Sequence, residues 1–120
     1  MTPQVVALDV DTWENDLGQG GHGYHLDLLT IDCGWKPLAE LRPNREFGRQ
    51  LYETPSLIGC AFGVDARLYR KLGGFDQHML FWGVEDLDLG LKCWLMGNEV
   101  LHDPLAVVGH RFRTSFDSYN

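Results

Sequence analysis

The sequence predicts an α/β (α+β) fold in which two main helices pack on a mixed sheet. Residues 5–8 are a short apolar run typical of a buried strand. Residues 85–96 repeat apolar side chains at the period of an amphipathic helix. Strand, helix, loop, helix and strand patterns follow one another through the second half, as expected when helices cover a sheet. With 120 residues the chain can form one hydrophobic core, and we expect a single domain over residues 1–120.

In the first half of the chain we expect strands joined by loops. After the first strand, four glycines within residues 18–23 predict a turn or loop. Residues 25–35 alternate loosely between apolar and polar side chains, which predicts a strand with a bulge between Leu28 and Ile31. Residues 37–53 are polar and rich in arginine, so we expect a surface loop with at most one helical turn.

The second half begins with an apolar segment and a short helix. Residues 57–64 include two glycines, which predicts a buried strand that lies close to another backbone. Asp65 is a suitable N-cap for a helix over residues 66–72, because its carboxylate can accept the unpaired N–H groups of the first turn. Gly73 and Gly74 then end that helix.

Residues 85–96 predict the longest helix of the chain. The side chains predicted for its inner face are Leu87, Leu91, Trp94 and Leu95. Gly97 follows as a helix terminator. We expect two short strands after it, over residues 99–102 and 105–108, on either side of a turn at Asp103-Pro104.

The composition narrows the classes of function. Ten Lys and Arg against 17 Asp and Glu give a net charge of −7, which argues against nucleic acid as the partner. Cys33, Cys60 and Cys93 form no Cys-x-x-Cys pair, so we expect buried free thiols and no zinc or redox motif. No run approaches the ~20 apolar residues of a membrane span, and the N-terminus lacks a signal-peptide pattern. We expect a soluble, cytoplasmic protein or a piece of a larger one.

Three sequence blocks together resemble one family of enzymes. They are residues 54–65 (TPSLIGCAFGVD), residues 73–88 (GGFD, then WGVEDLD) and residues 108–113 (VGHRFR). Their order and spacing are similar to the C-terminal half of GT-A-fold glycosyltransferases such as the polypeptide N-acetylgalactosaminyltransferases and the β-1,4-galactosyltransferases. Residues 20–37 resemble the upstream hairpin of that family more weakly. The resemblance implies a partial GT-A-like mixed sheet with the acceptor and metal side, lacking the N-terminal nucleotide-binding half.

The resemblance also implies a metal-dependent reaction with a nucleotide-sugar donor. A divalent ion, Mn²⁺ or Mg²⁺, would neutralise the donor diphosphate as a Lewis acid. His110 matches the family's late metal-binding histidine, for which the alternative is a structural or surface histidine. Arg113 matches an arginine near the donor phosphates, a task suited to its planar fork of donors.

Asp9 and Asp11 follow the first strand in an Asp-x-Asp arrangement. They could complete a metal site with His110. The alternative is that residues 5–13 correspond to the family strand that follows the metal motif, so that both acids simply lie at a strand end.

Glu85 and Asp86 are the candidate catalytic residues on the acceptor side. A carboxylate beside the acceptor hydroxyl can take its proton when the surroundings tune its pKa. In the β-1,4-galactosyltransferase pattern the second acid is the base, so Asp86 favours an inverting reaction. Alternatively, both acids only complement the positive end of the helix dipole. Just before them, Trp82 could stack on a sugar ring or simply pack, and Gly83 could let the loop move or approach a sugar.

The sequence thus predicts a glycosyltransferase, or a catalytic part of one, acting on a nucleotide sugar and a carbohydrate or protein acceptor. The alternative is a non-catalytic module that binds carbohydrate or a protein partner, with homo-oligomers forming across an exposed sheet edge. The enzyme hypothesis requires that the carboxylates of residues 85–86 and the imidazole of His110 line one cleft.

Overall fold

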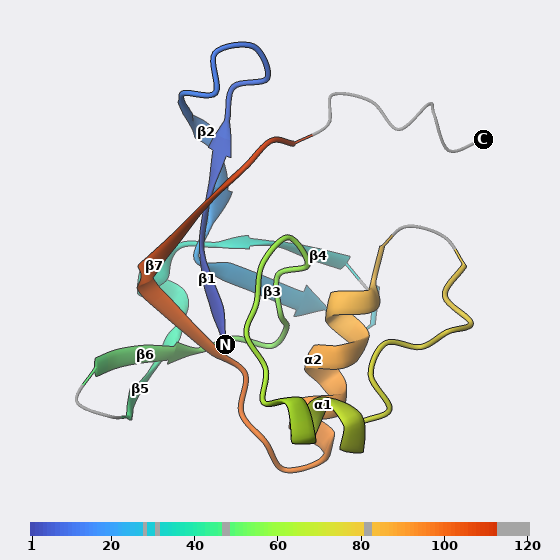
Figure 1. Cartoon of the computed structure of the whole chain (residues 1–120). Helices are drawn as coiled ribbons and strands as arrows, with labels where there is room; N and C mark the ends of the chain where they lie inside the picture. Colours follow the sequence, from blue (N-terminus) through green and yellow to red (C-terminus); the bar gives the residue numbers. More distant parts are fainter. Residues whose placement is uncertain (28, 31, 47–48, 81–82, 113–120) are drawn as a thin grey trace.

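The computed structural model describes residues 1–27, 29–30, 32–46, 49–80 and 83–112 (Figure 1). Its strands are β1 (Thr2–Leu8), β2 (Asn15–Gly21), β3 (Gly23–Asp27), β4 (Asp32–Lys36), β5 (Arg42–Glu46), β6 (Arg49–Glu53) and β7 (Leu101–His110). Its helices are the 3₁₀ turn η1 (Leu38–Glu40), α1 (Ala66–Lys71) and α2 (Glu85–Leu95). The described part therefore has the predicted mixed α/β fold with two α-helices.

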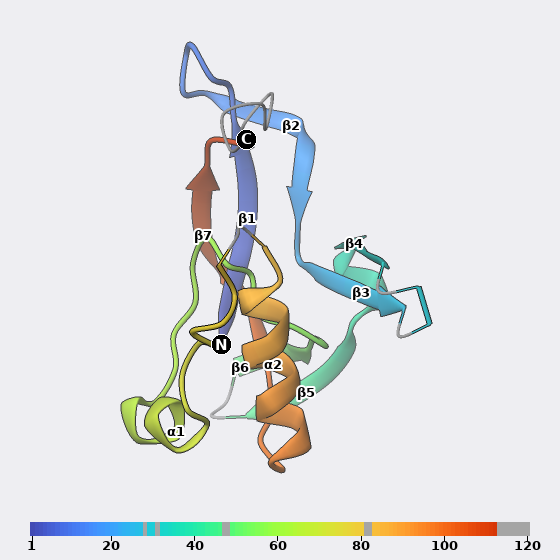
Figure 2. The same ribbon diagram turned by 90° about the vertical axis from the view of Figure 1, so that its right-hand side faces the viewer.

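The strands form two separate sheets. The larger sheet has the order β2-β1-β7-β6-β5, and β3 pairs with β4 in a smaller one. β1 is parallel to β7, with Ala7 opposite His110, and antiparallel to β2. β6 is antiparallel to β5 and β7, so the larger sheet is mixed. The β3–β4 hairpin stands to one side of the larger sheet (Figure 2).

The short helix α1 begins and ends as predicted. The Asp65 carboxylate accepts hydrogen bonds from the backbone N–H groups of Arg67 and Leu68, at 2.9 Å each. Gly73 and Gly74 have φ angles of +82° and +66°, the left-handed conformation that commonly ends a helix.

The longer helix α2 covers the core with a face that only partly matches the prediction. Its buried residues are Leu87, Leu89, Gly90 and Cys93. Leu95, which was expected to face inward, is 84% exposed. Gly90 lies in the buried face and brings the helix close to the backbone of residues 56–57, since a Cβ there would lie 2.9 Å from Ser56 Cα. The contact with this segment sets which side of α2 is buried.

The glycine-rich segment is a strand, so the predicted loop over residues 18–23 is wrong. Most of these residues belong to β2, an edge strand that pairs with β1. A Cβ at Gly20 would lie 2.5 Å from the Val5 carbonyl oxygen. Glycine therefore allows the close approach of two strand backbones at an irregular register.

Residues 25–35 form most of a hairpin, and the prediction of one bulged strand is wrong. Gly23 of β3 pairs with Lys36 of β4, and Asp27 pairs with Asp32. The Asp27 carboxylate accepts the Leu29 N–H at 2.8 Å, which closes the chain on itself and reverses its direction. The bulge predicted between Leu28 and Ile31 falls on residues outside the described part.

Residues 37–53 contain strands where only a surface loop with one helical turn was predicted. The helical turn is η1, and β5 and β6 follow it as a hairpin. Arg42 pairs with Glu53 across this hairpin, and their side chains form an ion pair of 3.4 Å. Pro43 is tolerated because β5 is an edge strand.

The apolar segment 57–64 is not a strand, which corrects another prediction. Leu57 and Ile58 are each 2% exposed, and the Ala61 N–H donates to the Ile58 carbonyl at 3.1 Å in a turn. The apolar side chains of this segment pack under α2, where Leu57 joins Leu89 and Cys93 in the core.

The two short strands predicted after α2 are one continuous strand, β7. Pro104 is accommodated because the pairing with β1 shifts from Pro3–Asp103 to Gln4–Val107. The extra residues on β7 form an irregularity at which proline loses no ladder hydrogen bond.

Two of the three thiols are not buried as expected. Cys93 is buried in the core, whereas Cys33 and Cys60 are exposed, and all three are free thiols. In the described residues, no helix is both long and apolar enough to span a membrane.

Candidate functional site

The two predicted catalytic acids open α2, immediately after a strained turn. Glu85 and Asp86 occupy its first turn, and the preceding Val84 has a left-handed φ of 62° with no side-chain cap. Gly83 also has a positive φ, of 106°. A β-branched residue in this region is an outlier that the surrounding structure has to enforce. The backbone before the acids is thus held in an unusual conformation that sequence reasoning missed.

The Asp86 carboxylate is fixed in place by two backbone donors. Its Oδ2 accepts the Gly59 N–H at 2.8 Å and its Oδ1 accepts the Leu87 N–H at 2.8 Å. Burial raises the pKa of Asp86 above its usual value, the two N–H groups oppose this rise, and the neighbouring Glu85 adds to it. An oriented carboxylate with a raised pKa has the properties of a general base.

Gly59 gathers both acids at one point of the surface. A Cβ at this position would lie 3.1 Å from Asp86 Oδ2 and 3.2 Å from Glu85 Oε1. The absence of a side chain therefore lets the two carboxylates approach the backbone of the loop before α1. This residue was predicted to serve close packing in a strand, and the close approach is to the acids instead.

An aromatic row leads from Tyr24 to Phe112, next to His110. Burial, together with the charges of Asp86 and Glu85, raises the pKa of Tyr24 on β3. The Tyr24 ring lies 4.6 Å from the Trp35 ring, centroid to centroid, and Trp35 meets Phe112 edge-on at 6.3 Å. We refer to Tyr24, Trp35 and Phe112 as the aromatic row, and all three are half-buried.

His110 lies at the far end of this row. It is the last residue of β7, and its ring packs against Phe112 with the centroids 4.3 Å apart. Its Nδ1 is buried and has no hydrogen-bond partner in the described part of the chain. Ring contacts thus run from Tyr24 through Trp35 and Phe112 to His110, and the two acids act on Tyr24 through their charge.

Asp9 and Asp11 lie beyond the end of β1, next to the strand that carries His110. The Asp9 carboxylate closes its own loop, accepting the N–H groups of Asp11 and Thr12 at 2.9 and 2.7 Å. These bonds lower the pKa of Asp9. Within the residues described, no group of three or more His, Cys, Asp or Glu side chains is arranged to hold a metal ion. His110 can offer one ligand, whereas Asp9, Asp11 and His110 do not form a complete set.

Two predicted substrate-binding residues, Trp82 and Arg113, lie outside the described residues. Their roles stay predictions. Arg111, which is described, places its guanidinium 5.4 Å from the centre of the Trp13 ring.

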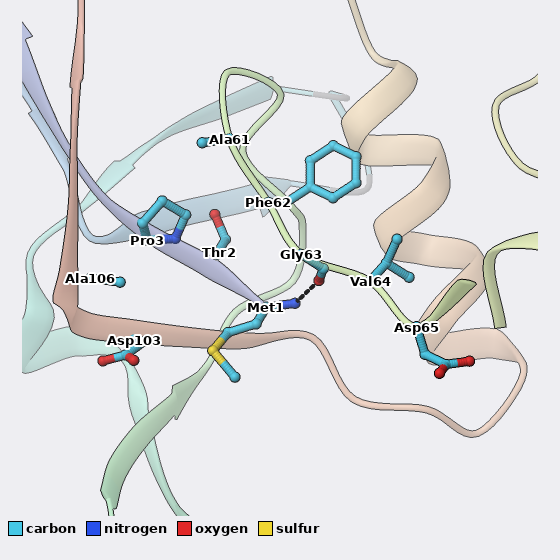
Figure 3. A pocket seen from close by; sticks show the side chains of 10 residues that line it. All are labelled: Met1, Thr2, Pro3, Ala61, Phe62, Gly63, Val64, Asp65, Asp103 and Ala106. Carbon is cyan, nitrogen blue, oxygen red and sulfur yellow. Dashed lines mark hydrogen bonds between the residues drawn. The ribbon is translucent and has the colours of Figure 1, made fainter. Parts of the chain in front are cut away.

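Neither of two surface pockets joins the acids to His110. One pocket of about 470 Å³ lies between β1, β7 and residues 61–65, where the Met1 amino group donates to the Gly63 carbonyl at 2.7 Å (Figure 3). The other, of about 390 Å³, is lined by parts of β1, β2 and β4 together with His22. Neither lining includes residues 85, 86 or 110, so a common cleft for these groups stays a prediction.

Replacing Val84 with glycine is expected to stabilise the protein by about 0.5–1 kcal/mol, because the left-handed conformation costs a β-branched residue more than it costs glycine. Chemical denaturation would measure the change in the free energy of unfolding, provided that the variant and the parent have equal m-values. Val64→Gly is the matched control, since Val64 has no positive φ, and it should destabilise. A loss of stability in the Val84 variant would contradict the interpretation that the backbone at Val84 is strained.

Parts of the chain are similar to known proteins. Residues 44–111, more than half of the chain, match the sequence model of a family described as "N-terminal domain of galactosyltransferase". Polypeptide N-acetylgalactosaminyltransferase 3 of Mus musculus is 24% identical over 119 residues, covering 95% of this chain and 19% of that protein. Polypeptide N-acetylgalactosaminyltransferase 8 of Drosophila melanogaster is 28% identical over 112 residues, covering 93% of this chain and 18% of that protein. Polypeptide N-acetylgalactosaminyltransferase 11 of Xenopus tropicalis is 35% identical over 77 residues, covering 64% of this chain and 13% of that protein. The chain thus spans less than a fifth of the length of these relatives.

Proposed function

Since the chain belongs to the family described as the N-terminal domain of galactosyltransferase, we propose that this glycosyltransferase-family domain supplies the acceptor side of sugar transfer. The donor would be a nucleotide sugar, and the acceptor a hydroxyl of a protein or carbohydrate. The observation that carries the proposal is Asp86, a half-buried carboxylate that two N–H groups orient and whose pKa is raised. The blocks around it suggest the C-terminal part of a GT-A-like catalytic domain.

In the proposed reaction Asp86 is the base. The acceptor oxygen forms a bond to the anomeric carbon while the bond from that carbon to the diphosphate oxygen breaks, and the acceptor proton moves to Asp86. Attack opposite the leaving group inverts the configuration. Glu85, which lies at the same glycine, would bind neighbouring hydroxyls of the acceptor.

The aromatic row supports a ligand of this kind. Aromatic faces commonly line sites for small ligands, with a few polar groups that fix the orientation. The charges of both acids act on the pKa of the Tyr24 hydroxyl, so we infer that this ring lies near them. We propose that the acceptor lies along this face, which gives Tyr24 a role in binding that the sequence did not indicate.

A divalent metal, Mn²⁺ or Mg²⁺, would supply charge neutralisation of the donor diphosphate when bound. We propose His110 as one ligand, because its ring nitrogen Nδ1 has no other partner among the described residues. The remaining ligands would come from the diphosphate and from further carboxylates.

Binding of a nucleoside diphosphate tests this proposal. In titration calorimetry, uridine diphosphate with Mn²⁺ is expected to bind, and His110→Ala should weaken binding by at least about tenfold, as loss of a metal ligand does. His78→Ala is the matched control, because the His78 side chain is 97% exposed in a loop. Absence of binding at millimolar nucleotide would contradict donor binding by this chain.

A non-catalytic module is the second candidate function. It is supported by the exposed apolar side chains Leu105 and Val107 on β7, which are 76% and 57% exposed. Pairing of two copies or binding of a partner over these residues would cover them. Dimers in sedimentation experiments, together with no nucleotide binding, would favour this function over the first.

A further inference from the structure

A contact between two histidines, one buried and one half-buried, lies between the two sheets of the described part. His22 lies between β2 and β3, at the start of the small hairpin, and His102 lies on β7 of the larger sheet. His22 Nδ1 and His102 Nε2 are 3.2 Å apart, and the rings meet edge to face at 83°. His102 is 0% exposed. The pair therefore ties the entry of the β3–β4 hairpin to the centre of the larger sheet.

The hydrogen bond between the two rings can form only when at most one of them is protonated. Two imidazole nitrogens can share a hydrogen bond only when one donates and the other accepts. If both rings are protonated, two N–H donors face each other. His102 Nδ1 also has no partner in the described part of the chain, and neither has the hydroxyl of Thr2, its neighbour on β1. A proton added to His102 would therefore create a buried charge beside His22, which the backbone of Thr2 and Pro3 and the charge of Asp103 offset only in part.

The surroundings favour the neutral pair. Burial, and the charge of His22 when protonated, lower the pKa of His102 to about 4. Burial also lowers the pKa of His22. The backbone of Thr2, the charge of Asp103 and the backbone of Pro3 act in the opposite direction on the pKa of His102, with smaller effects. The other titratable groups on the segments next to the pair are the Met1 amino group, Tyr52, Glu53 and Lys36.

Apart from the histidine pair, side-chain contacts connect the hairpin to the rest of the described molecule, among them the Trp35 ring of β4 against Phe112 just after β7. The hairpin shares no strand ladder with the larger sheet, and the His22 N–H reaches the Lys36 carbonyl at 3.4 Å within the hairpin itself. The Trp35 side chain also lies close to Gly21 of β2, and the side chains of Thr54 and Leu41 lie close to Gly23 of β3, since a Cβ added at these glycines would lie 3.0 Å from Trp35 Cε3 and from Thr54 Oγ1. Figure 2 shows the hairpin standing apart from the five strands.

We propose that the His22–His102 pair is a pH-sensitive latch that holds the β3–β4 hairpin on the larger sheet and releases it in mildly acidic solution. The latch is independent of the proposed enzymatic function. Because the histidine pKa values are lowered in the closed state, the neutral pair stabilises the closed hairpin above the usual histidine pKa of about 6.5. This stabilisation is lost as the pH falls from there toward the lowered values.

Hydrogen exchange measured at several pH values tests the latch. After correction for the intrinsic rate, hairpin amides at residues 23–27 and 32–36 should lose protection between pH 6.5 and 4.5. The open fraction should increase up to about tenfold per pH unit for each proton taken up. Amides of β1 report global unfolding, and their protection should change less. Equal changes in the hairpin and β1, or constant hairpin protection over this range, would overturn the proposal.

Two variants separate the latch from other acid effects. In His22→Gln the amide oxygen can accept a hydrogen bond from a protonated His102, so hairpin protection at pH 5 should stay within about twofold of the neutral value. His25→Gln is the matched control: His25 lies on β3 against Gly34 and not against His102. It should leave the acid release unchanged. Release that persists in the His22 variant, or disappears in the His25 variant, would overturn the assignment.

Discussion

Replacing Asp86 with asparagine is expected to slow sugar transfer by about 10²–10⁴-fold, because the variant keeps the shape of the side chain but cannot take the acceptor proton. The initial rate of labelled sugar incorporation from a nucleotide sugar into an acceptor measures this directly. The variant should also lose some thermal stability, because its amide oxygen can accept only one of the two N–H bonds that Asp86 receives and its amide nitrogen cannot accept the other. The two rates are therefore compared well below the thermal transition of the variant.

Asp32→Asn is the control for charge, because it removes an exposed carboxylate from β4 and should not change the rate. In the proposed reaction, activity of the unsubstituted protein should also be lost on acidification at a higher pH than an ordinary aspartate would cause, because the pKa of Asp86 is raised and its protonated form is not a base. Equal rates for the Asp86 variant and its parent would remove Asp86 as the base and leave Glu85 as the candidate.

Replacing Gly90 with alanine is expected to lower the free energy of unfolding by about 1–3 kcal/mol, the usual cost of forcing an extra carbon into a packed interior. This expected loss of stability is the opposite of the usual effect of the substitution, because alanine in a helix interior is normally favoured over glycine by about 1 kcal/mol. The added Cβ would lie 2.9 Å from Ser56 Cα and 3.0 Å from Leu57 N. Both are backbone atoms, so neither can rotate away.

Gly63→Ala is the matched control for this substitution. A Cβ at Gly63 would meet nothing within 4 Å, and the residue has no positive φ. Its stability should be unchanged or slightly increased. If urea denaturation gives both variants the same stability, α2 does not pack against residues 56–57 as described.

The features that could be predicted from sequence are those that neighbouring residues determine. Asp65 caps α1 and Gly73-Gly74 end it because the partners are a few residues away. The hairpin of β5 and β6 was missed because its stabilisation comes from pairing between strands, and its polar surface side chains resemble those of a loop. Residues 57–64 were mistaken for a strand because periodicity cannot distinguish an apolar strand from an apolar segment buried under a helix.

The candidate site was predictable in the same limited sense. The sequence places Glu85 and Asp86 at the start of a helix, and the structure confirms that position. Their surroundings come from distant segments: Gly59 from the loop before α1 and Tyr24 from β3. No local pattern marks either residue, because each is defined by where the chain folds back onto the acids.

The parallel pairing of β1 with β7 has a consequence for how the protein is made. The paired residues, such as Thr2 with His102 and Ala7 with His110, are separated by roughly a hundred residues, and closing so long a loop is entropically costly and slow. During synthesis β1 precedes β7 by roughly a hundred residues, so its parallel pairing has to wait for that whole stretch. Until then its backbone donors and acceptors on that side are open to other chains, so nascent-chain association should be most severe just before β7 emerges.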